Sequence, residues 1–162
     1  CCQLGPLVNE DVFRKAEAHT RDALAKGARL LAGGERLTGP EYDRGYFWPP
    51  TVLTHTDHSM LIMTEETFGP VVGLMPVAPL DEAIACANDS PYGLAAYVFT
   101  RNLANALRAA EQCEAGSVWV NNIHRSYNQV PFGGYKESGL GREKSRYGLE
   151  EYLELKTIYL SL

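Results

Sequence analysis

Residues 70–121 read PVVGLMPVAPLDEAIACANDSPYGLAAYVFTRNLANALRAAEQCEAGSVWVN and alternate strand-like with helix-like segments. Residues 70–77, 94–100 and 117–121 are apolar runs of strand length, and the first is apolar enough that we expect burial on both faces. Between them lie two helical segments, one opened by Pro79 and one capped by Thr100 and stopped by Gly116, with the stripes Leu80, Ala83, Ile84, Ala87 and Leu103, Ala106, Leu107, Ala110. The alternation predicts an α/β fold, three-layer αβα with a mostly parallel sheet.

The flanking sequence extends this pattern on both sides. Asn9 is a good cap for a helix over residues 9–26, whose apolar side is Phe13, Ala16, Ala23 and Leu24 and whose stop is Gly27. We further expect strands at residues 28–32 and 47–54, a long glycine-rich loop at 131–143, and a helical turn near 147–153. A terminal strand at residues 155–160 has no later partner in the chain, so we expect it to pair with another subunit.

Length and charge exclude several classes of protein. The chain has 162 residues, 15 Lys plus Arg against 20 Asp plus Glu, and a formal net charge of -5. That balance argues against nucleic-acid binding, which needs a basic face. No apolar run reaches the roughly 20 residues that span a bilayer, so we expect no membrane partner. The first residues carry neither a secretory signal nor an initiator Met, and we expect the chain to begin inside a longer protein.

Four cysteines are too few to indicate a disulfide framework. Adjacent Cys1 and Cys2 would form a strained ring if they were oxidised to each other. Cys86 and Cys113 lie on or beside apolar helical faces, where an inert buried thiol is expected. We therefore expect free thiols and a reducing, cytoplasmic location.

An acidic segment, Glu65-Glu66-Thr67-Phe68-Gly69-Pro70, is the first candidate for a binding site. Ligands of open α/β sheets collect beyond the carboxyl ends of the strands, where we expect this segment, residues 121–130 and the glycine-rich loop to lie. A carboxylate accepts from two vicinal hydroxyls, as in a ribose, and a neighbouring Phe offers a flat face to a planar ring. The alternative is a solvated acidic turn with Phe68 in the core.

Two other patterns are weaker. The loop at residues 131–143 is rich in glycine but has neither the order of a P-loop nor a GxGxxG that opens a helix, so its glycines are expected to serve turns and close backbone approach. His55 and His58, with Asp57 between them, have a spacing compatible with part of a metal site, but no Cys or third His is near in sequence and a plain loop explains them better. We expect no metal.

Four motifs together resemble the C-terminal part of the aldehyde dehydrogenase superfamily, namely TEETFGPVV (64–72), ANDSPYGLAAYVFT (87–100), GSVWVNN (116–122) and PFGGYKESGLGRE (131–143). The resemblance runs from about Leu4 to the end, in the family's order and spacing. It implies a partial catalytic domain of that family, with an α/β core at residues 1–150, an oligomerisation tail at 151–162 and no dinucleotide-binding domain.

The resemblance also implies roles for individual residues. Glu66 and Phe68 match the positions that hold the nicotinamide ribose and pack near the nicotinamide ring, in enzymes that use NAD or NADP. Phe132 matches an aromatic wall of the aldehyde pocket, and His124 falls in the variable loop on its other side. Glu143 matches an acidic residue that relays protons in some members. Arg142 and Glu154 match positions that pair at or beside the dimer interface in many members.

The family's nucleophilic Cys and general-base Glu precede all four motifs, and neither Cys1 nor Cys2 matches the nucleophile. We therefore expect the chain to act as part of an aldehyde-oxidising enzyme, to need the missing N-terminal half as a partner, to form a homo-oligomer through its last strand, and to bind no cofactor alone. One alternative is a stand-alone ester hydrolase using Cys1, Cys2, Cys86, Cys113 or Ser138. Another is a non-catalytic assembly module.

Overall fold

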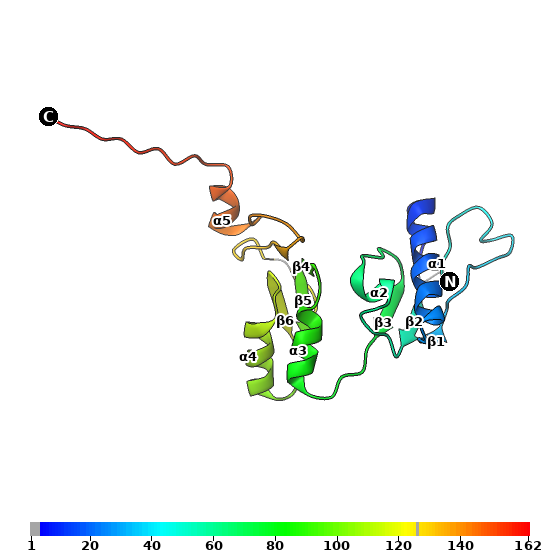
Figure 1. The fold of residues 1–162 in the computed structure, drawn as a ribbon. Helices are drawn as coiled ribbons and strands as arrows, with labels where there is room; N and C mark the ends of the chain where they lie inside the picture. Colours follow the sequence, from blue (N-terminus) through cyan, green and yellow to red (C-terminus); the bar gives the residue numbers. More distant parts are fainter. Residues whose placement is uncertain (1–3, 126) are drawn as a thin grey trace. The chain divides into compact units, whose positions relative to one another are not determined.

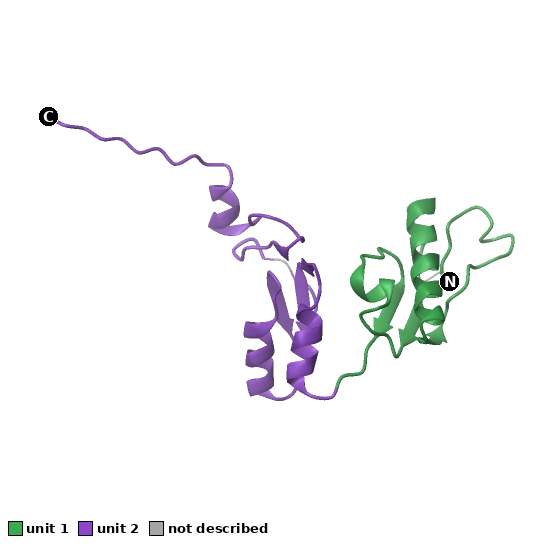
Figure 2. Ribbon diagram, in the orientation of Figure 1, with its two compact units in different colours: residues 1–77 green, residues 78–162 purple. Residues whose placement is uncertain are grey.

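The computed structural model describes residues 4–125 and 127–162, which form two compact units, residues 4–77 and 78–162 (Figure 2). Each of these units has its own helices and strands (Figure 1). The sequence, in contrast, predicts one partial domain. The predicted α/β class is confirmed. None of the helices in the described residues is long and apolar enough to cross a membrane.

Helix α1, Glu10–Ala25, organises the first unit. The Asn9 side chain accepts a hydrogen bond from the Val12 N–H at 2.9 Å, which confirms the predicted cap. Phe13 and Ala16 are buried with Trp48, whose ring meets Phe13 edge-on at a centroid distance of 5.5 Å. Ala23 is buried in a second cluster with Leu53 and Met60, whereas Leu24, expected on the same face, is exposed.

The first unit holds a sheet of three strands in the order β1 (Arg29–Ala32), β2 (Thr51–Thr54), β3 (Val71–Leu74). Strands β2 and β3 are parallel and are connected through a short helix, α2 (Leu61–Thr64), that the sequence analysis missed. Strand β1 is antiparallel to β2, because residues 33–50 between them contain no crossover helix. The prediction that the strand in residues 70–77 is buried on both faces was wrong. Strand β3 lies at the edge of the sheet, and its residues Val72 and Leu74 are exposed.

The second unit is built around a parallel pair, β5 (Ala95–Val98) and β6 (Ser117–Val120). Helix α3 (Leu80–Asn88) precedes the pair and α4 (Leu103–Gln112) connects its strands. The cap of α4 is Asn102 rather than Thr100, because its side chain accepts from the Asn105 N–H at 3.2 Å. In the predicted stripe of α4, Ala106 is buried, whereas Leu103 and Leu107 are exposed.

Two short strands order the glycine-rich segment, which was predicted to be a loop throughout. Strand β7 (Tyr135–Lys136) pairs antiparallel with β4 (Tyr92–Gly93), and helix α5 (Ser145–Glu150) follows. The predicted terminal strand does not form, and residues 155–160 have no regular structure and are exposed. A strand needs a partner strand to satisfy its backbone hydrogen-bonding groups. Residues 155–160 have no such partner in the described part of the chain, which explains why no strand forms there.

Candidate functional site

The Glu66–Phe68 segment lies at the amino end of β3, not beyond the carboxyl end of a strand as predicted. Glu66 is exposed, and the ring of Phe68 is 79% exposed, so the alternative with Phe68 in the core is wrong for this chain. Phe68 has a φ of 56°, in the left-handed region that bulky residues rarely adopt. A carboxylate and an aromatic face are therefore presented together to solvent.

Two hydrogen bonds hold the backbone immediately after Phe68. The Val71 N–H donates to the Gly69 carbonyl at 2.8 Å, and the Thr51 N–H donates to the Pro70 carbonyl at the same distance. A Cβ on Gly69 would lie 3.2 Å from the Cβ of Ala16, so the turn packs closely against α1. Both the sheet and helix α1 thus hold the turn.

Thr67, between the two predicted cofactor residues, is buried and shares a hydrogen bond of 2.8 Å with His19 Nδ1. The imidazole of His19 is 2% exposed. Sequence reasoning missed His19, although its position three residues after Ala16 places it on the buried face of α1.

A second group of predicted residues comes together in unit 2. The ring centroids of His124 and Phe132 lie 5.5 Å apart in an edge-on contact, and His124 also contacts Trp119 at 4.9 Å. Trp119 stacks on Tyr97 at 5.3 Å, which completes an aromatic row from the strand pair β5–β6 to the glycine-rich segment. A cavity of about 290 Å³ beside this row is lined by Trp119, Arg125, Tyr127, Phe132 and Lys144, among others.

Backbone contacts of the glycine-rich segment position Phe132. Phe132 and Glu143 exchange two backbone hydrogen bonds, of 2.9 and 2.8 Å, and the side chain of Glu143 is exposed. A Cβ on Gly116 would collide with the Gly133 carbonyl, so this close approach requires glycine. Phe132 therefore has a fixed backbone next to the start of β6.

Arg142 and Glu154 are not paired in the described structure. The Arg142 guanidinium donates to the carbonyls of Gly134 and Gly141, at 3.0 and 2.6 Å, and lies over the Tyr135 ring. Glu154 is exposed in the segment after α5. Arg142 thus connects two parts of the glycine-rich segment to each other. Its role at a subunit interface stays a prediction.

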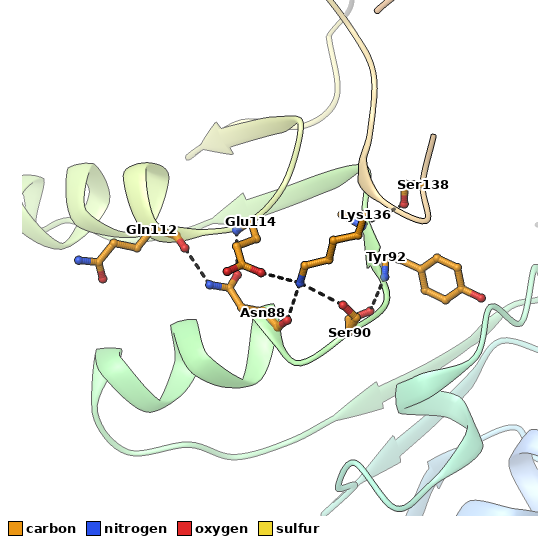
Figure 3. A network of polar contacts seen from close by, with 8 residues as sticks. Asn88, Ser90, Tyr92, Gln112, Glu114, Lys136 and Ser138 are labelled. Atoms are coloured by element: carbon orange, nitrogen blue, oxygen red, sulfur yellow. Dashed lines mark hydrogen bonds and ion pairs between the residues drawn. The ribbon is translucent and has the colours of Figure 1, made fainter. Parts of the chain in front are cut away.

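Lys136 forms a junction that the sequence analysis missed (Figure 3). Its ammonium donates to the backbone carbonyls of Asn88 and Ser90, at 2.6 and 3.0 Å, and forms an ion pair with Glu114 at 2.7 Å. The Asn88 side chain reaches the same end of α4 by donating to the Gln112 carbonyl at 2.8 Å. Together with Lys136 itself, the partners come from three segments far apart in sequence, and no local pattern in the glycine-rich segment points to this junction.

The alternative nucleophiles show no activation among the described residues. The hydroxyl of Ser138 accepts a hydrogen bond from the Gly93 N–H at 2.9 Å, which gives it a structural partner. Burial raises the pKa of the Cys113 thiol, which lowers its thiolate fraction. Cys86 is half-buried, and Cys1 and Cys2 lie outside the described residues. In residues 4–125 and 127–162, no three His, Cys, Asp or Glu side chains group in a way that could hold a metal ion.

Comparisons with known proteins bear directly on these motifs. The sequence matches the aldehyde dehydrogenase family over residues 1–158. It is 46% identical to 3-sulfolactaldehyde dehydrogenase of Pseudomonas putida, over 96% of this chain and 31% of that protein. It is also 46% identical to the mitochondrial succinate-semialdehyde dehydrogenase of Rattus norvegicus, over 95% of this chain and 29% of that protein.

The fold has a counterpart in a solved structure. Betaine aldehyde dehydrogenase from Staphylococcus aureus in complex with NAD+ matches with a TM-score of 0.87 at 43% identity, over 93% of this chain and 30% of that chain. The chain thus spans about a third of the length of the relatives that it matches. The matched length and the level of identity lead to one conclusion: this chain belongs to the aldehyde dehydrogenase family.

Proposed function

We propose that the chain is the C-terminal third of an NAD(P)-dependent aldehyde dehydrogenase that oxidises an aldehyde to a carboxylic acid. The order of the four sequence motifs supports this position. The chain would contribute cofactor and aldehyde contacts, and the rest of the enzyme would contribute the nucleophile. Because the relatives are named for different aldehydes, the proposal stops at the aldehyde class.

The single observation that carries the proposal is the joint exposure of Glu66 and Phe68 on a turn held by both the sheet and helix α1. Exposed carboxylate oxygens accept from the two hydroxyls of a ribose, and the exposed ring face fits a planar nicotinamide. NAD or NADP, when bound, supplies the hydride acceptor. The chain's own part is to bind the ribose through Glu66 and to orient the ring beside Phe68.

In unit 2, Phe132 and His124 would form an aromatic wall of the aldehyde pocket. Their contact, and the backbone bonds that fix Phe132, support a rigid wall that excludes water from a bound aldehyde. Glu143, exposed beside Phe132 in the bridge, would accept or return a proton through its carboxylate. Residues 155–160 would dock on a second copy, with Arg142 and Glu154 at or beside that interface.

A hybrid enzyme tests the cofactor role. This chain would replace the matching part of the Pseudomonas putida relative, and NADH formation would be measured with and without Glu66→Gln. We expect the variant to raise the KM for NAD roughly tenfold, because an amide gives up one charged acceptor, while the KM for aldehyde stays unchanged. Glu41→Gln, at an exposed carboxylate in the same unit, is the matched control. An unchanged KM for NAD in the Glu66→Gln hybrid would refute the cofactor role.

A further inference from the structure

His19 is a buried polar side chain that the proposed mechanism does not use. It lies on α1 with 2% exposure, in a helix whose other buried side chains are Phe13, Ala16, Thr20 and Ala23. A buried imidazole needs hydrogen-bond partners to offset its desolvation. Both of its ring nitrogens face the segment of residues 65–67, and neither partner lies on α1 itself.

Each ring nitrogen of His19 has a polar partner on the segment of residues 65–67. Nε2 lies 3.4 Å from a carboxylate oxygen of Glu65, and an ionised carboxylate only accepts hydrogen bonds. A proton on Nε2 therefore fits this environment. Nδ1 and the Thr67 hydroxyl share the second hydrogen bond, at 2.8 Å.

Thr67 lies between Glu66 and Phe68, so its hydrogen bond with His19 holds the middle of this short segment. The contact of Gly69 with Ala16, one helical turn before His19, gives a second anchor on the same helix. The left-handed backbone of Phe68 lies between these anchors, and such a conformation persists only where its surroundings hold it in place. Without the polar anchor, Phe68 can relax to a negative φ and turn its ring away.

We propose that His19 is a positioning residue that holds Glu66 and Phe68 in the geometry that receives the nicotinamide and its ribose, an inference that rests on the proposed function. His19 touches neither the cofactor nor the aldehyde. It acts through Thr67, and it determines whether the carboxylate and the ring are presented together before the cofactor arrives.

The first test uses the 162-residue chain without cofactor. NMR relaxation gives order parameters for the Phe68 and Gly69 amides in three variants. We expect His19→Leu and Thr67→Val to lower both from about 0.85, the value of rigid backbone, to below about 0.6. Thr20→Val is the matched control, because Thr20 is equally buried on α1 but its hydroxyl donates to the Ala16 carbonyl of the same helix at 2.7 Å.

Unchanged order parameters in Thr67→Val, relative to Thr20→Val, would overturn the proposal. Thr67→Val tests the proposal even if His19→Leu fails to fold. Valine has nearly the same shape as threonine, and the substitution removes the same hydrogen bond by deleting the Thr67 hydroxyl. His19→Gln, whose amide supplies both a donor and an acceptor, is expected to restore the rigid turn.

A second readout separates positioning from simple stability. In the hybrid enzyme, Thr67→Val should raise the KM for NAD roughly tenfold with the KM for aldehyde unchanged, as expected for one lost buried hydrogen bond. A purely structural role would lower the melting temperature and leave the KM for NAD unaltered, which would contradict the proposal. A hybrid that does not use NAD at all refutes the proposed function, whereas the order parameters still decide whether His19 holds the turn.

Discussion

The backbone of Phe68 is in a strained conformation that its surroundings must hold in place. A left-handed conformation costs a bulky residue about 1 kcal/mol or more, and the exposed ring recovers little of this through packing. Strain of this kind concentrates where a side chain must be presented to a ligand. At the scale of the residue, the proposed function therefore predicts that Phe68 contributes to cofactor binding rather than to stability.

Replacing Phe68 with glycine separates these two properties. In Phe68→Gly, relief of the backbone strain and the larger freedom of glycine in the unfolded chain oppose each other, so stability should stay within about 1 kcal/mol of the parent. The KM for NAD in the hybrid enzyme should rise roughly tenfold, because the aromatic face is lost. Urea denaturation and steady-state kinetics measure the two effects.

His55→Gly is the matched control, because His55 is exposed in the same unit and has a φ of 58°. It should show the same small change in stability with no change in the KM for NAD. A Phe68→Gly variant that loses several kcal/mol of stability at an unchanged KM would mean that Phe68 is a structural residue.

Individual residues show how far the sequence could be interpreted. The cap at Asn9 and the burial of Phe13, Ala16 and Ala23 follow from local pattern, and the structure has them as predicted. Leu103 and Leu107 match the same kind of pattern and yet are exposed, because no other described element of unit 2 covers that part of α4. His19 and Lys136 could not be assigned, because the partners of their hydrogen bonds lie 46 to 48 residues away and periodicity carries no information about such pairs.

At the scale of elements, Asp22 on α1 holds the beginning of α2. Its carboxylate accepts from Leu61 N–H at 2.8 Å and pairs with Lys26 at 2.7 Å. The hydrogen bond from Lys26, followed by that from the Leu61 N–H, holds the pKa of Asp22 below its usual value. Stability from this group is therefore complete above the unfolded-state pKa and is lost as pH falls through the folded-state value.

Asp22→Asn should reduce the acid sensitivity of unit 1. We expect the variant to be less stable than the parent at neutral pH and the difference to shrink below about pH 4. Trp48 reports on unit 1 in a Trp119→Phe background, because each unit contains one of the chain's two tryptophans. Hydrogen bonds from Ser59 hold the pKa of Asp57 low as well, so some acid sensitivity persists in the variant. A difference that grows as pH falls would contradict this account of Asp22.

Lys136 joins elements of unit 2 in the same way. Lys136→Met leaves two carbonyls and the Glu114 carboxylate without their donor, so unit 2 should lose about 1–3 kcal/mol of stability. Trp119 reports on this unit in a Trp48→Phe background. Lys156→Met, at an exposed lysine near the end of the chain, should change nothing. Equal stability of the two variants would show that the junction adds no stability.

At the scale of the whole molecule, several large apolar side chains of unit 2 are exposed. Leu103 and Leu107 on α4 and Leu155, Ile158 and Leu160 near the end of the chain are all exposed. Large exposed apolar patches mark surfaces that bind other proteins or other parts of the same protein. This agrees with a chain that spans about a third of its relatives.

Removing residues 154–162 tests the proposed docking of the tail. Sedimentation velocity should show association of the full chain and a smaller species after truncation, because an unpaired strand gains backbone partners only from a neighbour. Circular dichroism should be nearly unchanged, since these residues contain no helix or strand in the single chain. Identical sedimentation of the two chains would exclude the tail as the interface.

The most direct test of the central claim is reconstitution of activity from two pieces. The Pseudomonas putida relative would be produced without the part that matches this chain, either as an N-terminal or as a C-terminal remainder, and mixed with this chain. The account predicts NAD-dependent aldehyde oxidation only with the N-terminal remainder, and weaker use of NAD after Glu66→Gln. Activity of this chain alone, or only with the C-terminal remainder, would contradict it.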